Sequence, residues 1–369
     1  MSTVIFKQAA YHYPDLYPVV SQMLDALSGA ISWNQARVLI KPNLLLAARP
    51  EKAITTHPLI IKAVVEYVQR RGGQVHIFDS PAIGSMDKIE TGGGYRAVLH
   101  DLGVKFKAFS SQVKVDIGEP FGRISMAREP FEADVVINLP KLKTHSQMLL
   151  TLGVKNMFGC VIGLEKPQWH LRSGVDRGLF ARLLVQIYQA VQPPITLLDG
   201  ILSLEGQGPG KRGTPRRLGV MVGGNNALAV DAAVCGMLGI EPDRLFTNRA
   251  AGQMGLLDFT IDLRGETIKA PGFILPVLGS LDMGPKPLHK FIRKHFLQKP
   301  VAERHLCKLC GECWKYCPAK AITPEDEKIR FDYDRCIRCY CCSEVCPHGA
   351  LDIVEPFPGK LMRKLSGLR

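Results

Sequence analysis

Hydrophobic positions in the first three quarters of the chain alternate between short apolar runs and segments with helical spacing. Short apolar runs are typical of strands buried on both faces. We expect strands at 38–40, 75–78, 104–109, 133–139, 195–198 and 218–222. Between them, hydrophobic residues recur every three or four positions, as expected for helices. We expect helices at 58–71, 95–102, 178–191 and 227–238.

Strands that alternate with helices are the pattern of an α/β fold, with a mostly parallel sheet and flanking helices. We assign this fold to residues 1–285. Several expected strands end in polar residues that are costly to bury unpaired. These are Lys41, Asn43, Asp79, Ser80, residues 141–145, and Asp199 with Gly200, where the strand 195–198 is expected to end. Because ligands bind at the carboxyl ends of parallel strands, we predict a shared site there.

The candidate catalytic residues at this edge are mostly cations. They are Lys41, Lys141, Lys143, His145, Lys155 and Asn156. A cationic pocket suits a carboxylate or phosphate and stabilises negative charge that develops during a reduction. Lys143 and His145 are also candidate proton donors, because burial lowers a lysine pKa and histidine titrates near neutrality. The alternative is that the cations form structural ion pairs with Asp79, Asp199, Glu205 or Asp231.

Near its end the chain contains two cysteine runs of the form CxxCxxCxxxCP, offset by 29 residues, from Cys307 to Pro318 and from Cys336 to Pro347. This is the bacterial spacing for 4Fe–4S clusters, in which the fourth cysteine of each run binds the other cluster. Cluster I is therefore assigned to Cys307, Cys310, Cys313 and Cys346. Cluster II is assigned to Cys336, Cys339, Cys342 and Cys317. A pair of zinc sites is the alternative, and Cys341 is interpreted as a non-ligand.

Residues 301–356 thus resemble a bacterial two-cluster ferredoxin module, which implies a small α+β domain. A second resemblance covers roughly residues 35–265. The motifs KPN (41–43), THP (56–58), NLPKLKTH (138–145), LGVKNMFGC (152–160), LDGI (198–201), EGQGPG (205–210) and AVDA (229–232), together with His170, are similar to those of the domain-of-unknown-function 362 family. That resemblance implies a fold and a set of positions, and no defined reaction.

The remaining sequence features limit which cofactors and partners we expect. The glycine-rich stretches 92–94 and 206–210 lack the phosphate-loop and dinucleotide-binding patterns, so we predict no nicotinamide site and leave a flavin open. The formal net charge of +13 favours an acidic redox partner, an anionic substrate or a membrane surface. No nucleic-acid recognition motif is present, and we expect no nucleic acid partner. Without a signal peptide or an apolar span in the sequence, we expect a cytoplasmic location.

Residues 286–300 are a basic, amphipathic linker, expected either to pack the module onto the α/β domain or to dock on a membrane or an acidic electron donor. Residues 357–369 form a basic tail. These features favour an iron–sulfur oxidoreductase, in which electrons pass through two 4Fe–4S clusters to an anionic substrate or second cofactor in the lysine-lined pocket. The alternative is a non-catalytic electron carrier or assembly partner of another redox enzyme.

Overall fold

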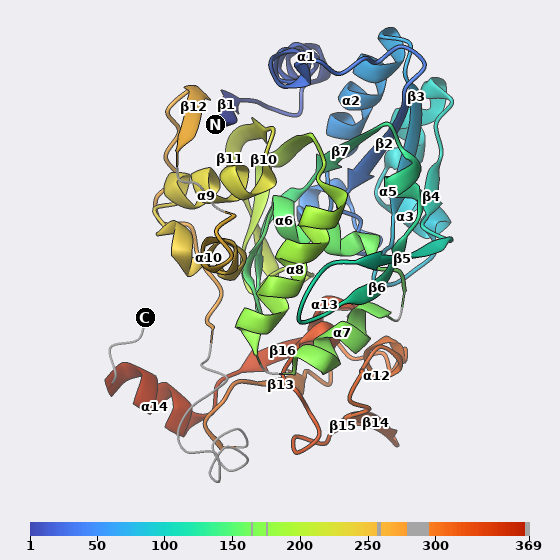
Figure 1. Cartoon of the computed structure of the whole chain (residues 1–369). Helices are drawn as coiled ribbons and strands as arrows, with labels where there is room; N and C mark the ends of the chain where they lie inside the picture. Colours follow the sequence, from blue (N-terminus) through green and yellow to red (C-terminus); the bar gives the residue numbers. More distant parts are fainter. Residues whose placement is uncertain (164, 175, 257–259, 279–294, 366–369) are drawn as a thin grey trace.

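The computed structural model describes residues 1–163, 165–174, 176–256, 260–278 and 295–365 (Figure 1). In these ranges a large sheet has the strand order β12-β1-β11-β10-β7-β2-β3-β4, with β8 beside β10 and β9 beside β8. Its strands are β1 (Ser2–Gln8), β2 (Arg37–Pro42), β3 (Gln74–Asp79), β4 (Phe106–Ala108), β7 (Val135–Leu139), β8 (Lys141–His145), β9 (Leu149–Thr151), β10 (Ile195–Gly206), β11 (Gly213–Gly224) and β12 (Ile261–Gly265). Neighbouring strands from β10 to β4 are parallel, whereas β11 and β9 run antiparallel to their neighbours. The prediction of a mostly parallel sheet with flanking helices is confirmed.

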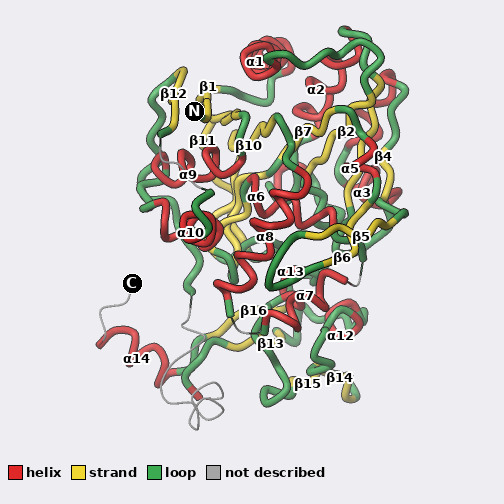
Figure 2. The backbone as a smooth tube through the Cα atoms, in the orientation of Figure 1, coloured by secondary structure: helices red, strands yellow, loops and turns green. Residues whose placement is uncertain are grey.

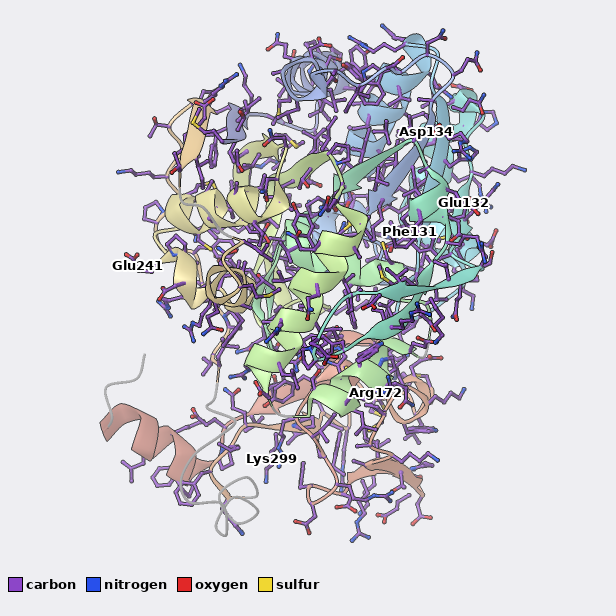
Figure 3. The ribbon with its side chains drawn as sticks, in the orientation of Figure 1. Phe131, Glu132, Asp134, Arg172, Glu241 and Lys299 are labelled. Carbon is purple, nitrogen blue, oxygen red and sulfur yellow. The ribbon has the colours of Figure 1, made fainter. Side chains whose placement is uncertain are left out.

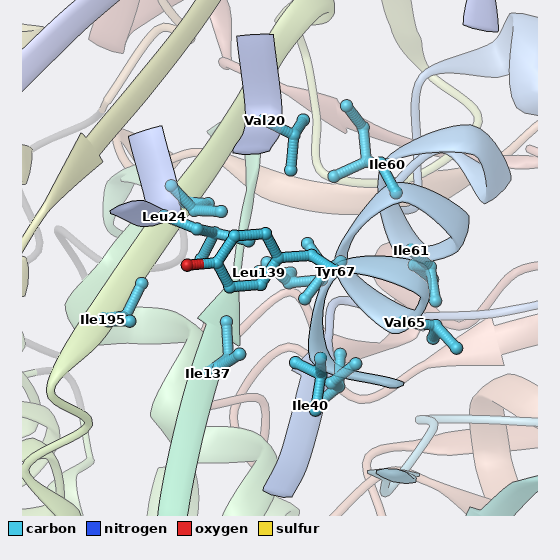
Figure 4. Packing of buried hydrophobic residues seen from close by; sticks show 14 of the residues in the cluster. Val20, Leu24, Ile40, Ile60, Ile61, Val65, Tyr67, Ile137, Leu139 and Ile195 are labelled. Atoms are coloured by element: carbon cyan, nitrogen blue, oxygen red, sulfur yellow. The ribbon is translucent and has the colours of Figure 1, made fainter. Parts of the chain in front are cut away.

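Successive residues of a strand point to opposite faces of the sheet, and each face has its own helices. Helices α1 (Tyr13–Ser28) and α2 (Pro58–Arg70) pack on Ile40, Ile137 and Ile195 (Figure 4). Helix α8 (Arg177–Val191) covers Leu39 and Val136 on the opposite face, and α9 (Ala227–Met237) packs beside it. The shorter helices are α3 (Met86–Gly92), α4 (Tyr95–Leu99), α5 (Glu129–Glu132), α6 (Gly153–Asn156), α7 (Glu165–Ser173) and α10 (Phe246–Gln253). Strands β5 (Gln112–Asp116) and β6 (Arg123–Ala127) form a separate hairpin.

Two expectations at the polar edge of the sheet are wrong. The strand expected to end at Asp199–Gly200 continues as β10 to Gly206, with a change of register between Gly200 and Leu202. Asp199 is tolerated inside this strand because its carboxylate accepts hydrogen bonds from Tyr11 and Lys141. The segment 141–145, expected as the polar end of β7, is itself strand β8 and pairs in parallel with β10.

The C-terminal module lies below the large sheet, next to α7 (Figures 1 and 2). Its described residues form two small strand pairs and three short helices. These are β13 (Lys299–Ala302) with β16 (Leu351–Val354), β14 (Ile322–Glu325) with β15 (Lys328–Phe331), α12 (Glu312–Lys315), α13 (Cys341–Glu344) and α14 (Phe357–Leu365). Arg172 of α7 and Lys299 of β13 lie near the border between the two parts (Figure 3). Most of the expected linker, up to residue 294, lies outside the described residues, and its last two positions already belong to β13.

Candidate functional site

The eight cysteines of the two runs surround two cavities in the module. The first has about 310 Å³ of empty volume and is lined by Cys307, Cys310, Cys313 and Cys346. The second has about 340 Å³ and is lined by Cys317, Cys336, Cys339 and Cys342, with Cys341 beside them, and both volumes include space open to solvent. Each group takes three cysteines from one run and the fourth from the other. We call these the cluster I and cluster II cavities.

The backbone repeats the 29-residue offset of the sequence. Leu309 and its counterpart Arg338 both have positive φ, at 51° and 58°. Gly311, with φ of 92°, corresponds to Tyr340, with φ of 59°. The amides of Ala321 and Ala350, also 29 residues apart, donate to the sulfurs of Cys317 and Cys346 over 3.4 and 3.2 Å. Both runs therefore adopt the same ligand-loop conformation. Only the first run has a glycine, Gly311, at the second positive-φ position, where the second run has Tyr340.

The cysteine groups fit a bulky cationic core better than a single ion. Within the described ranges, no three His, Cys, Asp or Glu side chains converge closely enough to hold one metal ion. Burial, followed by the neighbouring cysteines, raises the pKa of Cys313 to about 12. The same causes raise the pKa of Cys342. Iron at the centre of each group would offset this penalty on the thiolates.

A third cavity, which we call the lysine cavity, lies between the polar edge of the sheet and the module. Its empty volume is about 640 Å³, including its opening to solvent. The α/β part contributes Lys41, Lys143, Lys155 and Lys166, and the module contributes Tyr316, Cys341 and Glu344. Cys341 also lines the cluster II cavity, and it is the one described residue common to the two linings.

Two of the predicted cations are held by buried ion pairs. Lys41 donates to Asp79 over 2.7 Å, and Lys141 donates to Asp199 over 2.8 Å. Lys141 also donates to the hydroxyl of Tyr11 and does not line the cavity. The expectation that all five cations surround one pocket is therefore wrong for Lys141, because β8 pairs with β10 in a register that places Lys141 opposite Asp199.

The other cavity lysines have no carboxylate within ion-pair distance among the described residues. Lys143 donates to the Asn43 side chain and the Ile54 carbonyl, each over 2.7 Å, and Lys166 donates to the Ser80 carbonyl. Burial lowers the pKa of Lys143 to about 7, with repulsion from Lys155 as the next cause. Burial also lowers the pKa of Lys166 to about 8 and that of Lys155. These amines are therefore buried without a directly paired carboxylate, and Glu344 and Asp79 act on them only from farther away.

Asn156 orients Lys143 through Asn43. The Asn43 amide donates to Asn156 over 2.9 Å, which leaves the Asn43 oxygen facing Lys143. The Asn156 amide in turn donates to Asn138 over 2.8 Å. This predicted residue thus lines the cavity as part of an amide chain that fixes one lysine.

Histidines complete the lining. His145 Nδ1 accepts from the amides of Gln147 and Met148, so Nε2 carries the proton, and Nε2 lies 2.9 Å from Glu344 Oε1. Burial lowers the pKa of His145 to about 4. His170 Nδ1 and Thr151 Oγ1 are buried without a hydrogen-bond partner in the described part of the chain. Buried polar atoms of this kind normally have a partner, so both are candidates for contact with a ligand or water.

Lys166, Tyr316 and Glu344 were not among the sequence candidates. Lys166 follows no expected strand, so the strand-end pattern could not reveal it. Tyr316 and Glu344 lie in the module, at least 150 positions from the lysines of the same cavity, and no local pattern reports that proximity.

Comparison with known proteins identifies both parts of the chain. The family described as domain of unknown function DUF362 matches residues 38–236. The chain belongs to this family. A 4Fe-4S dicluster domain matches residues 299–347, so the DUF362 domain is followed by an iron–sulfur module.

Relatives of this DUF362 protein cover it to different extents. A thylakoid-associated protein of Synechocystis sp. is 33% identical over 310 residues, covering 82% of this chain and 96% of that protein. Pyruvate synthase subunit PorD of Thermotoga maritima is 36% identical over 58 residues, 15% of this chain and 59% of that subunit. Among solved structures, the lactate racemase apoprotein of Thermoanaerobacterium thermosaccharolyticum aligns with a TM-score of 0.37 and 14% identity, over 53% of this chain and 50% of that one. None of the helices described here has the length and apolar character needed to span a bilayer.

Proposed function

We propose that this protein is an iron–sulfur oxidoreductase that receives electrons from a redox protein and delivers them to an anionic ligand in the lysine cavity. The observation that carries the proposal is the position of Cys341, which lines both the cluster II cavity and the lysine cavity. Electron donor and acceptor sites would thus be adjacent, with Cys341 in the lining of both.

The cysteines hold the clusters in this proposal, with Cys307, Cys310, Cys313 and Cys346 around cluster I and the other four around cluster II. When bound, 4Fe–4S clusters accept and release single electrons at potentials that the surrounding protein tunes. The chain's own groups then stabilise negative charge on the ligand. Lys143 is suited to donate a proton, because its pKa of about 7 lies near neutrality.

Two measurements test this function. Protein purified without oxygen should contain about eight irons per chain, and zinc in their place would refute the cluster assignment. Reduced clusters should then be reoxidised by an anionic substrate in the wild type and much more slowly in Lys143→Ala. Reoxidation rates that no small molecule changes would contradict the enzyme proposal.

A second candidate function is electron delivery to a partner enzyme, with the α/β part as a docking platform. Its support is the module's similarity to proteins named as enzyme subunits, PorD and the delta subunit of NADH-dependent phenylglyoxylate dehydrogenase from Aromatoleum evansii. A stoichiometric redox partner in a pull-down, retained by Lys143→Ala, would favour this function.

The proposed location is the cytoplasm, and the thylakoid-associated relative supports contact with a membrane surface.

A further inference from the structure

The lysine cavity has an excess of positive charge that the fold itself does not balance. Four lysines line it, Lys41, Lys143, Lys155 and Lys166, against two carboxylates, Asp79 and Glu344. Lys41 forms an ion pair with Asp79, which leaves one lining carboxylate, Glu344, against three lysines. The cavity therefore lacks two negative charges when all its lysines are protonated. Buried charge of this kind is costly unless a ligand pairs with it.

The same cavity contains hydrogen-bonding atoms without partners in the described structure. His170 Nδ1 and Thr151 Oγ1 have none, although both side chains are about 96% buried. Leaving such buried atoms unpaired is destabilising, so a ligand that pairs with them would bind favourably. They come from α7 and β9, on elements other than those of Lys143 and Lys155, so the polar groups converge from several parts of the fold.

We propose that the lysine cavity binds a small dianion, a phosphate or dicarboxylate group, between the ammonium groups of Lys143 and Lys155, with Thr151 and His170 completing its hydrogen bonds. This names the ligand class of the cavity and so rests on the proposed function. A dianion supplies the two missing charges, whereas a monoanion supplies half of them. A ligand with more than two negative charges should bind less well, since its additional negative group would face the carboxylate of Glu344.

Binding should be linked to proton uptake, and Lys143 is the group that reports it. The charged groups around Lys143 are Lys155, Glu344, Asp79 and Lys141. Since its pKa is about 7 in the free protein, Lys143 is mostly neutral at pH 8. A bound dianion favours the ammonium form, so binding at pH 8 should take up a proton, whereas at pH 6 Lys143 is already charged and uptake should be small.

Binding should also be sensed by one cluster more than the other. Cys341 joins the lysine cavity to the cluster II cavity, while no described residue lines both the lysine cavity and the cluster I cavity. A negative ligand disfavours adding an electron nearby. The potential of cluster II should therefore fall on binding, and that of cluster I should change less.

The experiment is a calorimetric titration of cluster-loaded protein with sodium sulfate, whose charge is constant from pH 6 to 8. Nitrate at equal ionic strength is the monoanion control, and phosphate and oxalate test the two ligand classes by competition. We expect saturable sulfate binding, no nitrate binding, and heats at pH 8 that depend on the ionisation enthalpy of the buffer. Lys143→Met and Lys155→Met should each weaken binding at least tenfold, and the exposed Lys105→Met should not.

Each outcome has a distinct meaning. If sulfate does not bind, or binds equally well to both cavity variants, the dianion inference is wrong. Full iron content in the same protein would leave the proposed redox function unaffected. Too little iron would refute the proposed function whatever sulfate does. Thr151→Val removes a hydroxyl without removing a charge, and we expect it to bind sulfate more weakly than the wild type. This variant provides the test if a lysine variant fails to fold.

Discussion

At the scale of single residues, partners decide what each lysine does. Sequence placed Lys41, Lys141 and Lys143 in the same category, because each follows or adjoins a buried strand. The structure distinguishes them by the nearest acceptor, a carboxylate for the first two and neutral oxygens for Lys143. Which acceptor a lysine meets depends on strand register. The strands here are buried on both faces, so their continuous apolar runs lack the alternation that would specify the register.

The pairing makes a prediction for Lys41. Lys41→Met leaves the Asp79 carboxylate buried without its cation, so we expect the free energy of unfolding to fall by about 3–5 kcal/mol. Urea denaturation followed by circular dichroism measures it. The Lys41→Met, Asp79→Asn double variant should recover part of the loss. Arg37→Met, which breaks the exposed ion pair with Asp134, should change little. An equally small effect for Lys41→Met would show that this pair does not stabilise the fold.

At the scale of elements, the apolar runs predicted the central strands β2, β3 and β7 and the helices α2, α8 and α9 well. These elements are buried by packing alone, and periodicity reports packing. The same pattern did not identify β8, whose sequence KLKTH contains two lysines and a histidine. That strand is buried because its polar side chains have partners elsewhere in the fold, which no local pattern can show.

The ligand loops are elements whose pairing can be tested directly. Because Cys346 lines the cluster I cavity although it belongs to the second run, Cys346→Ser should impair cluster I and spare cluster II. We expect iron to fall from about eight to about four per chain, with the remaining paramagnetic signal matching that of cluster II. Cys317→Ser should produce the reverse.

Two further variants serve as controls for the ligand assignment. Cys235→Ser, at a buried cysteine of α9 far from the module in sequence, should keep all the iron. Cys341→Ser should keep it as well if Cys341 is no ligand. Loss of cluster II in Cys346→Ser would contradict the exchange of fourth ligands between the runs.

At the scale of the whole molecule, the site exists only where the two domains meet. The motifs of each domain could be predicted separately, since each is local. Their contact could not, because it joins loop 206–213 and β8 to α13 and β16 through pairs such as Arg212–Asp352, at 3.1 Å, and His145–Glu344. The interface is polar, so its stability should depend on protonation.

His145 provides the test of that dependence. Its pKa is about 4 in the folded protein and near 6.5 when unfolded, so the unfolded chain binds more protons between these values. The neutral form therefore stabilises the fold fully above pH 6.5, and this contribution is lost as the pH falls toward 4. Protonation at Nδ1 would also break its two backbone hydrogen bonds.

We expect wild-type stability to fall by on the order of 2 kcal/mol between pH 6.5 and 5 through this group. His145→Gln should flatten the curve in that range, although His170, whose pKa is also lowered by burial, leaves some slope. Urea midpoints of cluster-loaded protein at several pH values measure the effect, and the exposed His12→Gln is the control. If the urea midpoints of His145→Gln and the wild type fall equally with pH, protonation of His145 does not weaken the interface. Glu344 would then be stabilised by the cavity lysines instead.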